Sequence, residues 1–265
     1  MKLSRPVVVV VAAAVLAGCS SGRQPAASLA PSPSPSAEAI AEGRPCPAAP
    51  ADAGIDGRVG CVSSARGTFE PEDGPQSLIL YALLDDEGFP RQWRLRMTRT
   101  DGPPVDEVIY AGSPTSYPRM LGAADANADG RDEAFAKVAT HSYHSGATYD
   151  VGIFGVRDGD IYRVQIDGRP SLFQIGGVSV FGEGAECRDA DLDGDPEFLL
   201  LRIDGVFGEV QRWSERVYEW SGTTLHFASR REGRMAKTGY ADPLLYRYYS
   251  LRCFDFEPPF PYARG

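Results

Sequence analysis

The sequence predicts an all-β domain of repeated four-stranded antiparallel units, and three observations support this fold class. Short segments alternate apolar and polar residues and are rich in aromatic and β-branched side chains, which is typical of half-buried strands. Asp-Gly and Ser-Gly pairs at 158–159 and 221–222 separate such segments and indicate hairpin turns. An acidic loop motif occurs twice, 64 residues apart, and the order of strand-like segments recurs around it.

The first 18 residues are expected to be an export leader. Lys2 and Arg5 precede the apolar run 7–15, which is too short to cross a bilayer as a helix. The run leads into Leu-Ala-Gly-Cys at 16–19, which resembles a bacterial lipobox. The resemblance implies cleavage before Cys19 and attachment of a diacylglycerol group, with fatty acids such as palmitate. The alternative is an ordinary secretory signal in which Cys19 is incidental.

Residues 19–55 are predicted to form a tether, and the folded domain is expected to span 56–265. The tether is rich in Ser, Ala and Pro, includes APSPSPSA, and has almost no side chains apolar enough to form a core. Lipid on Cys19 would anchor the protein to the cell membrane on its extracytoplasmic face, because two or three acyl chains bind more firmly than one.

The remaining four cysteines are expected to form disulfides, because an exported protein meets an oxidising compartment. Four cysteines allow three pairings. We favour Cys46 with Cys61, which would join the tether to the first strand, and Cys187 with Cys253, which would tie the last strand to the domain. A zinc site is the weaker alternative, because no Cys-x-x-Cys spacing occurs.

The expected strands fall into groups around the acidic loops. The segments before the first loop would form one unit: 77–84, 92–99, 105–111 and 118–124. Those after the first and the second loop are 134–140, 149–159, 160–166, 198–204, 215–222 and 223–229. The last strand of each unit is expected to lead into its loop, so that each loop joins neighbouring units. Near the C-terminus, aligning Cys253 with Cys187 predicts a degraded third loop containing Asp255 and Glu257.

The two intact loops carry the ligand pattern of a hard cation. Oxygen-bearing side chains stand at loop positions 1, 3, 5 and 9, a carbonyl is available at position 7, and Gly at position 6 permits the curl. We expect structural Ca²⁺, since magnesium rarely uses an all-protein cage; the alternative is a pair of solvated acidic turns. The ligands would be Asp125, Asn127, Asp129, the carbonyl of Arg131 and Glu133, and then Asp189, Asp191, Asp193, the carbonyl of Asp195 and Glu197.

This motif, D-x-[DN]-x-D-G-x-x-E running into a strand, resembles the FG-GAP or VCBS repeats of integrin-α-type β-propellers. The resemblance covers most of 75–257 and implies a propeller-like fold of about three blades with calcium in the loops. The family usually closes with more blades, so closure is left open. An EF-hand is disfavoured because position 12 is Ala136 or Leu200 and strands follow both loops.

Composition and motifs limit the functions to consider. The net charge of −9 argues against binding to nucleic acid or to an anionic membrane surface, because no basic patch is evident. His141 and His144 lie in a polar segment between expected strands, and neither G-x-S-x-G nor H-E-x-x-H occurs. The tryptophans are expected in the core, with a stacking platform for carbohydrate or peptide as the alternative: Trp93, Trp213 and Trp220.

We therefore predict an exported, membrane-anchored lipoprotein whose calcium-stabilised β-repeat domain binds an unidentified protein or glycan at the cell envelope. No catalytic residue is assigned. The alternative is an extracellular hydrolase or lyase on the same scaffold, with His141 or His144 as the base. A histidine in a deep pocket beside a carboxylate would favour the enzyme, and an exposed loop tip would favour the binding module.

Overall fold

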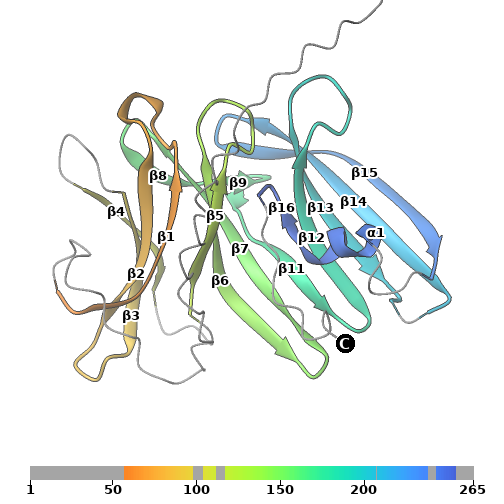
Figure 1. The fold of residues 1–265 in the computed structure, drawn as a ribbon, viewed down its shortest axis with the longest axis horizontal. Coiled ribbons are helices and arrows are strands. Elements are labelled where there is room, and N and C mark those ends of the chain that lie inside the picture. The colour runs from red at the N-terminus through yellow and green to blue at the C-terminus, as the bar shows by residue number, and fades with distance from the viewer. Residues whose placement is uncertain (1–56, 98–103, 112–116, 207, 238–242, 255–265) are drawn as a thin grey trace, which may run out of the picture. The chain divides into compact units, whose positions relative to one another are not determined.

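The first sheet contains four antiparallel strands in chain order, β1 (Val59–Gly67), β2 (Gln76–Leu84), β3 (Pro90–Met97) and β4 (Val105–Ala111) (Figure 1). The computed structural model describes residues 57–97, 104–111, 117–206, 208–237 and 243–254, all within one compact unit, Ala39–Gly265. A short 3₁₀ turn, η1 (Pro71–Asp73), connects β1 to β2. Three alternate residues in the middle of β2 are fully buried, as the alternation in 77–84 predicts: Leu78, Leu80 and Ala82.

The second sheet contains twelve strands in the order β10-β9-β15-β14-β13-β12-β11-β7-β6-β5, with β8 beside β7 and β16 beside β12. Most neighbours are antiparallel, but β9 pairs with β15 and β16 pairs with β12 in parallel. The strands are β5 (Arg119–Ala124), β6 (Glu133–Tyr143), β7 (Gly146–Arg157), β8 (Asp160–Arg163), β9 (Gln165–Ile166), β10 (Arg169–Pro170), β11 (Phe173–Val178), β12 (Phe181–Arg188), β13 (Glu197–Asp204), β14 (Val210–Ser221), β15 (Thr224–Ala236) and β16 (Leu251–Arg252).

The all-β fold class is confirmed, but the division into units differs from the expectation. A separate four-stranded sheet occurs once among the described residues, and the later strands merge into one sheet. The expected strand 118–124 contains β5, which pairs with β6 and not with β4. The segment 160–166 is divided at the buried Val164, so that β8 pairs with β7 while β9 pairs with β15.

The expectation that each acidic loop joins two units was wrong. The strands before and after each loop pair with one another, so the loops are the turns of the β5–β6 and β12–β13 hairpins. The register explains why: Ala124 pairs with Glu133, and Arg188 pairs with Glu197. Because the curl of the loop brings its first and ninth positions together, the chain leaves the loop beside the strand by which it entered.

Three apolar clusters hold the described residues together. The first lies between the four-stranded sheet and the β5–β8 region and includes Trp93, which is fully buried as predicted. The second lies on the opposite face of β6 and β7 and continues across β11–β15. In β6 Ala134 belongs to the first cluster and Phe135 to the second, because successive side chains point to opposite faces of a sheet.

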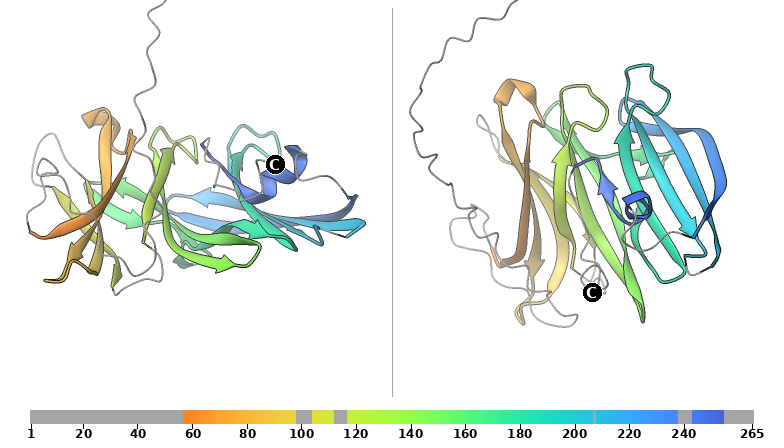
Figure 2. Two further views of the ribbon diagram at one scale, coloured as in Figure 1. Left: turned by 60° about the horizontal axis from the view of Figure 1, so that its bottom comes forward. Right: turned by 45° about the vertical axis from the view of Figure 1, so that its right-hand side comes forward.

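The third cluster lies beneath the C-terminal segment, which comprises α1 (Pro243–Tyr246), η2 (Arg247–Tyr249) and β16. Figure 2 shows α1 over one face of the large sheet, near β12 to β14. Glycines make room for this segment: a Cβ on Gly184 would lie 2.2 Å from the Arg247 carbonyl oxygen. β16 lies beside β12 in this sheet, so it is not the last strand of a third unit. Asp255 and Glu257 lie outside the described residues.

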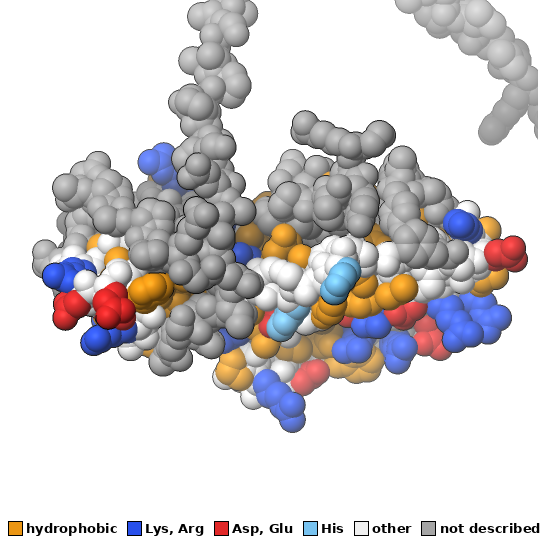
Figure 3. All heavy atoms as spheres, turned by 90° about the horizontal axis from the view of Figure 1, so that it is seen from below, with side chains coloured by type: hydrophobic (Ala, Val, Ile, Leu, Met, Phe, Trp, Pro, Cys, Tyr) orange, Lys and Arg blue, Asp and Glu red, His pale blue; other side chains and the backbone are white. Residues whose placement is uncertain are grey.

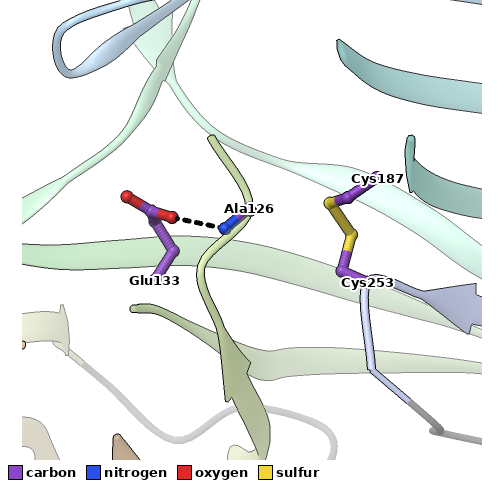
Figure 4. Close-up of a disulfide and its surroundings, with 4 residues drawn as sticks. All are labelled: Ala126, Glu133, Cys187 and Cys253. Atoms are coloured by element: carbon purple, nitrogen blue, oxygen red, sulfur yellow. Dashed lines mark hydrogen bonds between the residues drawn. A yellow bond between two sulfur atoms is a disulfide. The ribbon is translucent and has the colours of Figure 1, made fainter. Parts of the chain in front are cut away.

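The predicted disulfide between Cys187 and Cys253 is present, with the sulfur atoms 1.97 Å and the Cα atoms 4.7 Å apart (Figure 4). Cys61 is also disulfide-bonded. Its predicted partner Cys46 lies outside the described residues, as do Cys19 and the leader, so that pairing and the lipid anchor stay predictions. Among the described helices, none has the length and apolar character needed to cross a membrane.

Candidate metal centre

The two acidic loops lie on the same side of the large sheet, where the strands end in turns. Figure 1 shows the β5–β6 and β12–β13 turns side by side at the upper ends of their strands. Two strands, β7 and β11, separate β6 from β12. The neighbouring strands β6, β7, β11 and β12 all pair antiparallel. The start of β6 therefore lies on the same side of the sheet as the end of β12.

Each loop makes the same four internal hydrogen bonds, and in each bond a side-chain oxygen accepts from a backbone N–H. Position 1 accepts from position 6, position 3 from 5, position 5 from 7, and position 9 from 2. In the first loop the acceptor–donor pairs are Asp125–Gly130 (3.0 Å), Asn127–Asp129 (3.0 Å), Asp129–Arg131 (2.9 Å) and Glu133–Ala126 (3.0 Å). In the second they are Asp189–Gly194 (3.0 Å), Asp191–Asp193 (3.2 Å), Asp193–Asp195 (3.0 Å) and Glu197–Ala190.

The backbone of the two loops also matches. Position 4 has a positive φ in both, 57° at Ala128 and 69° at Leu192, and so does the glycine at position 6, with 84° at Gly130 and 107° at Gly194. The left-handed region costs little for glycine and more for other residues. Repetition of this strained geometry at equivalent positions shows that the loops adopt one conformation.

The glutamate at position 9 is the buried residue among the predicted side-chain ligands of each loop. Glu133 is 1% exposed and Glu197 is 5% exposed. Glu133 points toward the loop backbone and accepts from the Ala126 N–H (Figure 4). Burial, and then repulsion from Asp129, Asp125 and Asp132, raise the pKa of Glu133 to about 8. A buried carboxylate among other carboxylates is costly unless positive charge is supplied.

The second loop brings its carboxylates close together. Carboxylate oxygens of Asp189, Asp191, Asp193 and Glu197 all lie within 4.8 Å of one another. The first loop has an amide at position 3, and Asn127 Nδ2 donates to Glu133 Oε1 over 3.3 Å. Among the side chains at positions 1, 3, 5 and 9, the second loop therefore has four carboxylates and the first has three, and hard-cation chemistry suits this oxygen-rich donor set. The donor residues present fit Ca²⁺.

The loops face a common open hollow of about 380 Å³. Asp195, at position 7 of the second loop, also lines this hollow. The β14–β15 hairpin contributes residues that the sequence did not place there, from the end of β14 and from the turn. The lining residues are Asn127, Asp129, Asp191, Asp193, Asp195, Pro196, Glu197, Glu219, Trp220 and Gly222.

The first loop is also held by the residue that directly follows β1, Thr68. Asp132 Oδ2 accepts from the Thr68 N–H at 2.6 Å, and the Asp132 N–H donates to the Thr68 carbonyl at 2.9 Å. Nearby, the buried Glu70 accepts from the Gly159 N–H at 2.7 Å. These bonds couple the conformation of the first loop to the packing of the two sheets.

The histidines lie elsewhere. His141 Nε2 is 2.9 Å from Asp150 Oδ2, and Asp150 Oδ1 accepts from Gln174. The His141 side chain is 45% exposed and His144 is exposed in the β6–β7 turn. No hydrogen bond joins either histidine to a serine in the described part of the chain, and neither lines the hollow. Both histidines are therefore exposed, and His141 has a carboxylate beside it.

Comparison of the chain with models of known protein families, with curated proteins and with solved structures finds no match.

Proposed function

We propose that this protein is an exported lipoprotein, anchored through Cys19 to the extracytoplasmic face of the cell membrane, whose β domain is stabilised by calcium. The domain acts as a binding module for a protein or glycan at the cell envelope. The observation that carries the calcium proposal is the repeated loop, which in its second copy gathers four carboxylates within 4.8 Å.

The relation to FG-GAP or VCBS repeats and to a propeller-like arrangement also belongs to this proposal. Its support is the pair of loops with one register of hydrogen bonds and positive φ angles. Three of the four strands expected in the first unit, β2, β3 and β4, lie together in the four-stranded sheet. In this proposal the calcium ion has a structural role. Oxygen atoms of each loop bind an ion, and the charge of the ion offsets the mutual repulsion of the carboxylates.

Calcium should raise the stability of the full chain. Extracellular calcium sites commonly have dissociation constants of about 10⁻⁴ to 10⁻³ M, and calcium at about ten times that constant adds about 1.4 kcal/mol per site. We expect chelation to lower the melting temperature and calcium to restore it, as measured by differential scanning calorimetry. Calcium binding is measured directly by titration calorimetry.

Matched variants separate the two loops. Asp193→Ala should reduce the calcium response more than Asp129→Ala, because the second loop has more ligand charge. Asp195→Ala is the control, since position 7 is expected to bind through its carbonyl. If no calcium binding is detected and chelator leaves the melting curve unchanged, the loops are only acidic turns.

A further inference from the structure

One face of the β14–β15 hairpin concentrates positive charge. Arg212 lies directly opposite Arg234, and Arg216 lies directly opposite Arg230. All four side chains are exposed, and we call them the arginine face. Figure 3 shows Lys and Arg side chains gathered in the right-hand part of the view, over β14 and β15. The sequence-based expectation that no basic patch exists was therefore wrong at this place.

Acids on the same face offset its charge only in part: Asp204 lies directly opposite Arg212, and Glu232 stands on β15 between Arg230 and Arg234. Arg202 on the adjacent β13 already pairs with both Glu183 and Asp204. Arg230 pairs with Glu232 at 3.1 Å, where both side chains are exposed. For the other members the described residues supply no carboxylate within the 4.0 Å of an ion pair: Arg212, Arg216 and Arg234.

The pairing of like charges across two strands is unfavourable. Side chains directly opposite each other in an antiparallel pair are close, and like charges there destabilise the sheet. A partner that carries several negative charges on a flat surface would remove this repulsion. Charge complementarity therefore points to an extended anionic partner.

The same face ends in apolar residues. Val210 is 54% exposed and lies two residues before Arg212, on the same side of β14. At the other end Phe227 is 50% exposed and packs against Tyr218, two residues after Arg216. Basic side chains beside exposed apolar side chains are typical of surfaces that lie at a lipid–water interface.

We propose that the arginine face docks on the anionic headgroups of a lipid bilayer. The choice of lipid rests on the proposed function, because the leader and Cys19 would hold the domain beside a membrane. Each arginine near an anionic surface contributes about 1 kcal/mol. The net charge of −9 opposes other orientations, so the domain meets the membrane through this face.

Chemical modification of arginine by phenylglyoxal tests the docking on the full chain. The protein is mixed with vesicles of phosphatidylcholine, or of phosphatidylcholine and phosphatidylglycerol in equal amounts, and modified residues are quantified by peptide mass spectrometry. We expect several-fold less modification of the arginine face in the anionic vesicles only. Arg91 and Arg231, exposed on β3 and on the opposite side of β15, are internal controls whose modification should not change.

Variants identify the cause of any shielding. Arg212→Gln with Arg234→Gln should weaken docking roughly 25-fold, which is about 1 kcal/mol for each of two arginines, and should expose Arg216 and Arg230 again. Arg91→Gln with Arg231→Gln should leave the shielding intact. All chains are compared by circular dichroism and melting temperature, so that loss of docking is not confused with loss of fold.

Several results would overturn the proposal. The proposal would be wrong if the arginine face were modified equally in both kinds of vesicle, or if Arg91 and Arg231 were shielded equally. The arginines would then serve only to prevent association at a sheet edge. Shielding that requires calcium and survives the double variant would assign the contact to the acidic loops. Stronger shielding by a DNA duplex than by anionic vesicles would assign the face to nucleic acid. Failure of the calcium proposal alone leaves this experiment unaffected.

Discussion

Lys137 is a charged side chain in a largely apolar place. It lies on β6 beside Val151, and its Nζ is 5.6 Å from the centre of the Tyr149 ring. The cross-strand neighbour is another cation, Arg119. Burial, and then repulsion from Arg119, lower the pKa of Lys137 from 10.5 to about 8. Such a lysine opposes folding, because the unfolded chain solvates the ammonium better.

Replacement of this lysine should stabilise the protein in a pH-dependent way. Between about 8 and 10.5 the unfolded state binds the proton and the folded state does not, so wild-type stability rises with pH through this range. Below about 8 both states are charged and the burial cost is fully present. Lys137→Met should therefore add roughly 1–2 kcal/mol at neutral pH, and the gain should disappear near 10.5.

Urea unfolding of both chains at several pH values measures this difference. Arg91→Met, at an exposed position on β3, controls for loss of a surface charge and should show no pH-dependent gain. A gain from Lys137→Met that stays constant across the pH range would show that packing, and not ionisation, causes it.

At the scale of the elements, a buried ion cluster holds the C-terminal segment on the large sheet. Arg247 Nη2 is 2.7 Å from Glu186 Oε2, and Arg247 Nη1 is 3.1 Å from Glu215 Oε1. Both glutamates are 6% exposed. Arg188 also contacts both of them, at 3.3 and 3.7 Å. The disulfide Cys187–Cys253 then fixes the end of the segment.

Arg247→Met should destabilise the protein by roughly 2–4 kcal/mol, because it leaves two buried carboxylates with less compensation. Arg188 remains, so the cost should fall below that of a fully isolated buried charge. Adding Glu186→Gln and Glu215→Gln to the same chain should recover most of the loss. Unfolding in urea without reductant keeps the disulfide and measures each variant.

The exposed pair Arg58–Asp86 provides the matched control, with side chains 65% and 95% exposed. Arg58→Met should cost little, since exposed ion pairs contribute little to stability. If Arg247→Met costs no more than Arg58→Met, the cluster does not hold the segment.

The strands and their partners differ in how far the sequence predicts them. Alternation and turn residues located β2, β7 and β13, because burial of one face follows a local period. The partners are not local. The pairing of β7 with β11, and of β9 with β15, joins segments that no period relates. The predicted division of the later strands into separate four-stranded units failed for the same reason.

At the scale of the whole molecule, the candidate site shows the same division. The loop ligands could be predicted from the sequence, because position and residue type follow the needs of a hard cation. The hollow that both loops line together with Trp220 could not be predicted, because this hollow depends on the order of strands β12, β11, β7 and β6. The arginine face was missed because alternate residues on two strands create it.

The cysteines give the last prediction, and it concerns how the domain is connected to its N-terminal segment. Five cysteines are present, Cys187 and Cys253 are paired, and Cys61 is disulfide-bonded. If Cys19 carries lipid, Cys46 is the partner of Cys61, and the tether is fixed to β1. Peptide mapping of the full chain without reduction should then show Cys46 joined to Cys61 and Cys19 bearing a thioether-linked diacylglycerol.

Cys19→Ser should abolish incorporation of a labelled fatty acid while both disulfides remain. Cys46→Ser should leave lipidation intact and free the Cys61 thiol, which a thiol reagent detects. A peptide that joins Cys61 to Cys19 would contradict both the pairing and the lipid anchor, because one sulfur atom cannot serve in a disulfide and a thioether together. In that case the export leader would be an ordinary secretory signal, and the membrane would no longer be the obvious surface for the arginine face.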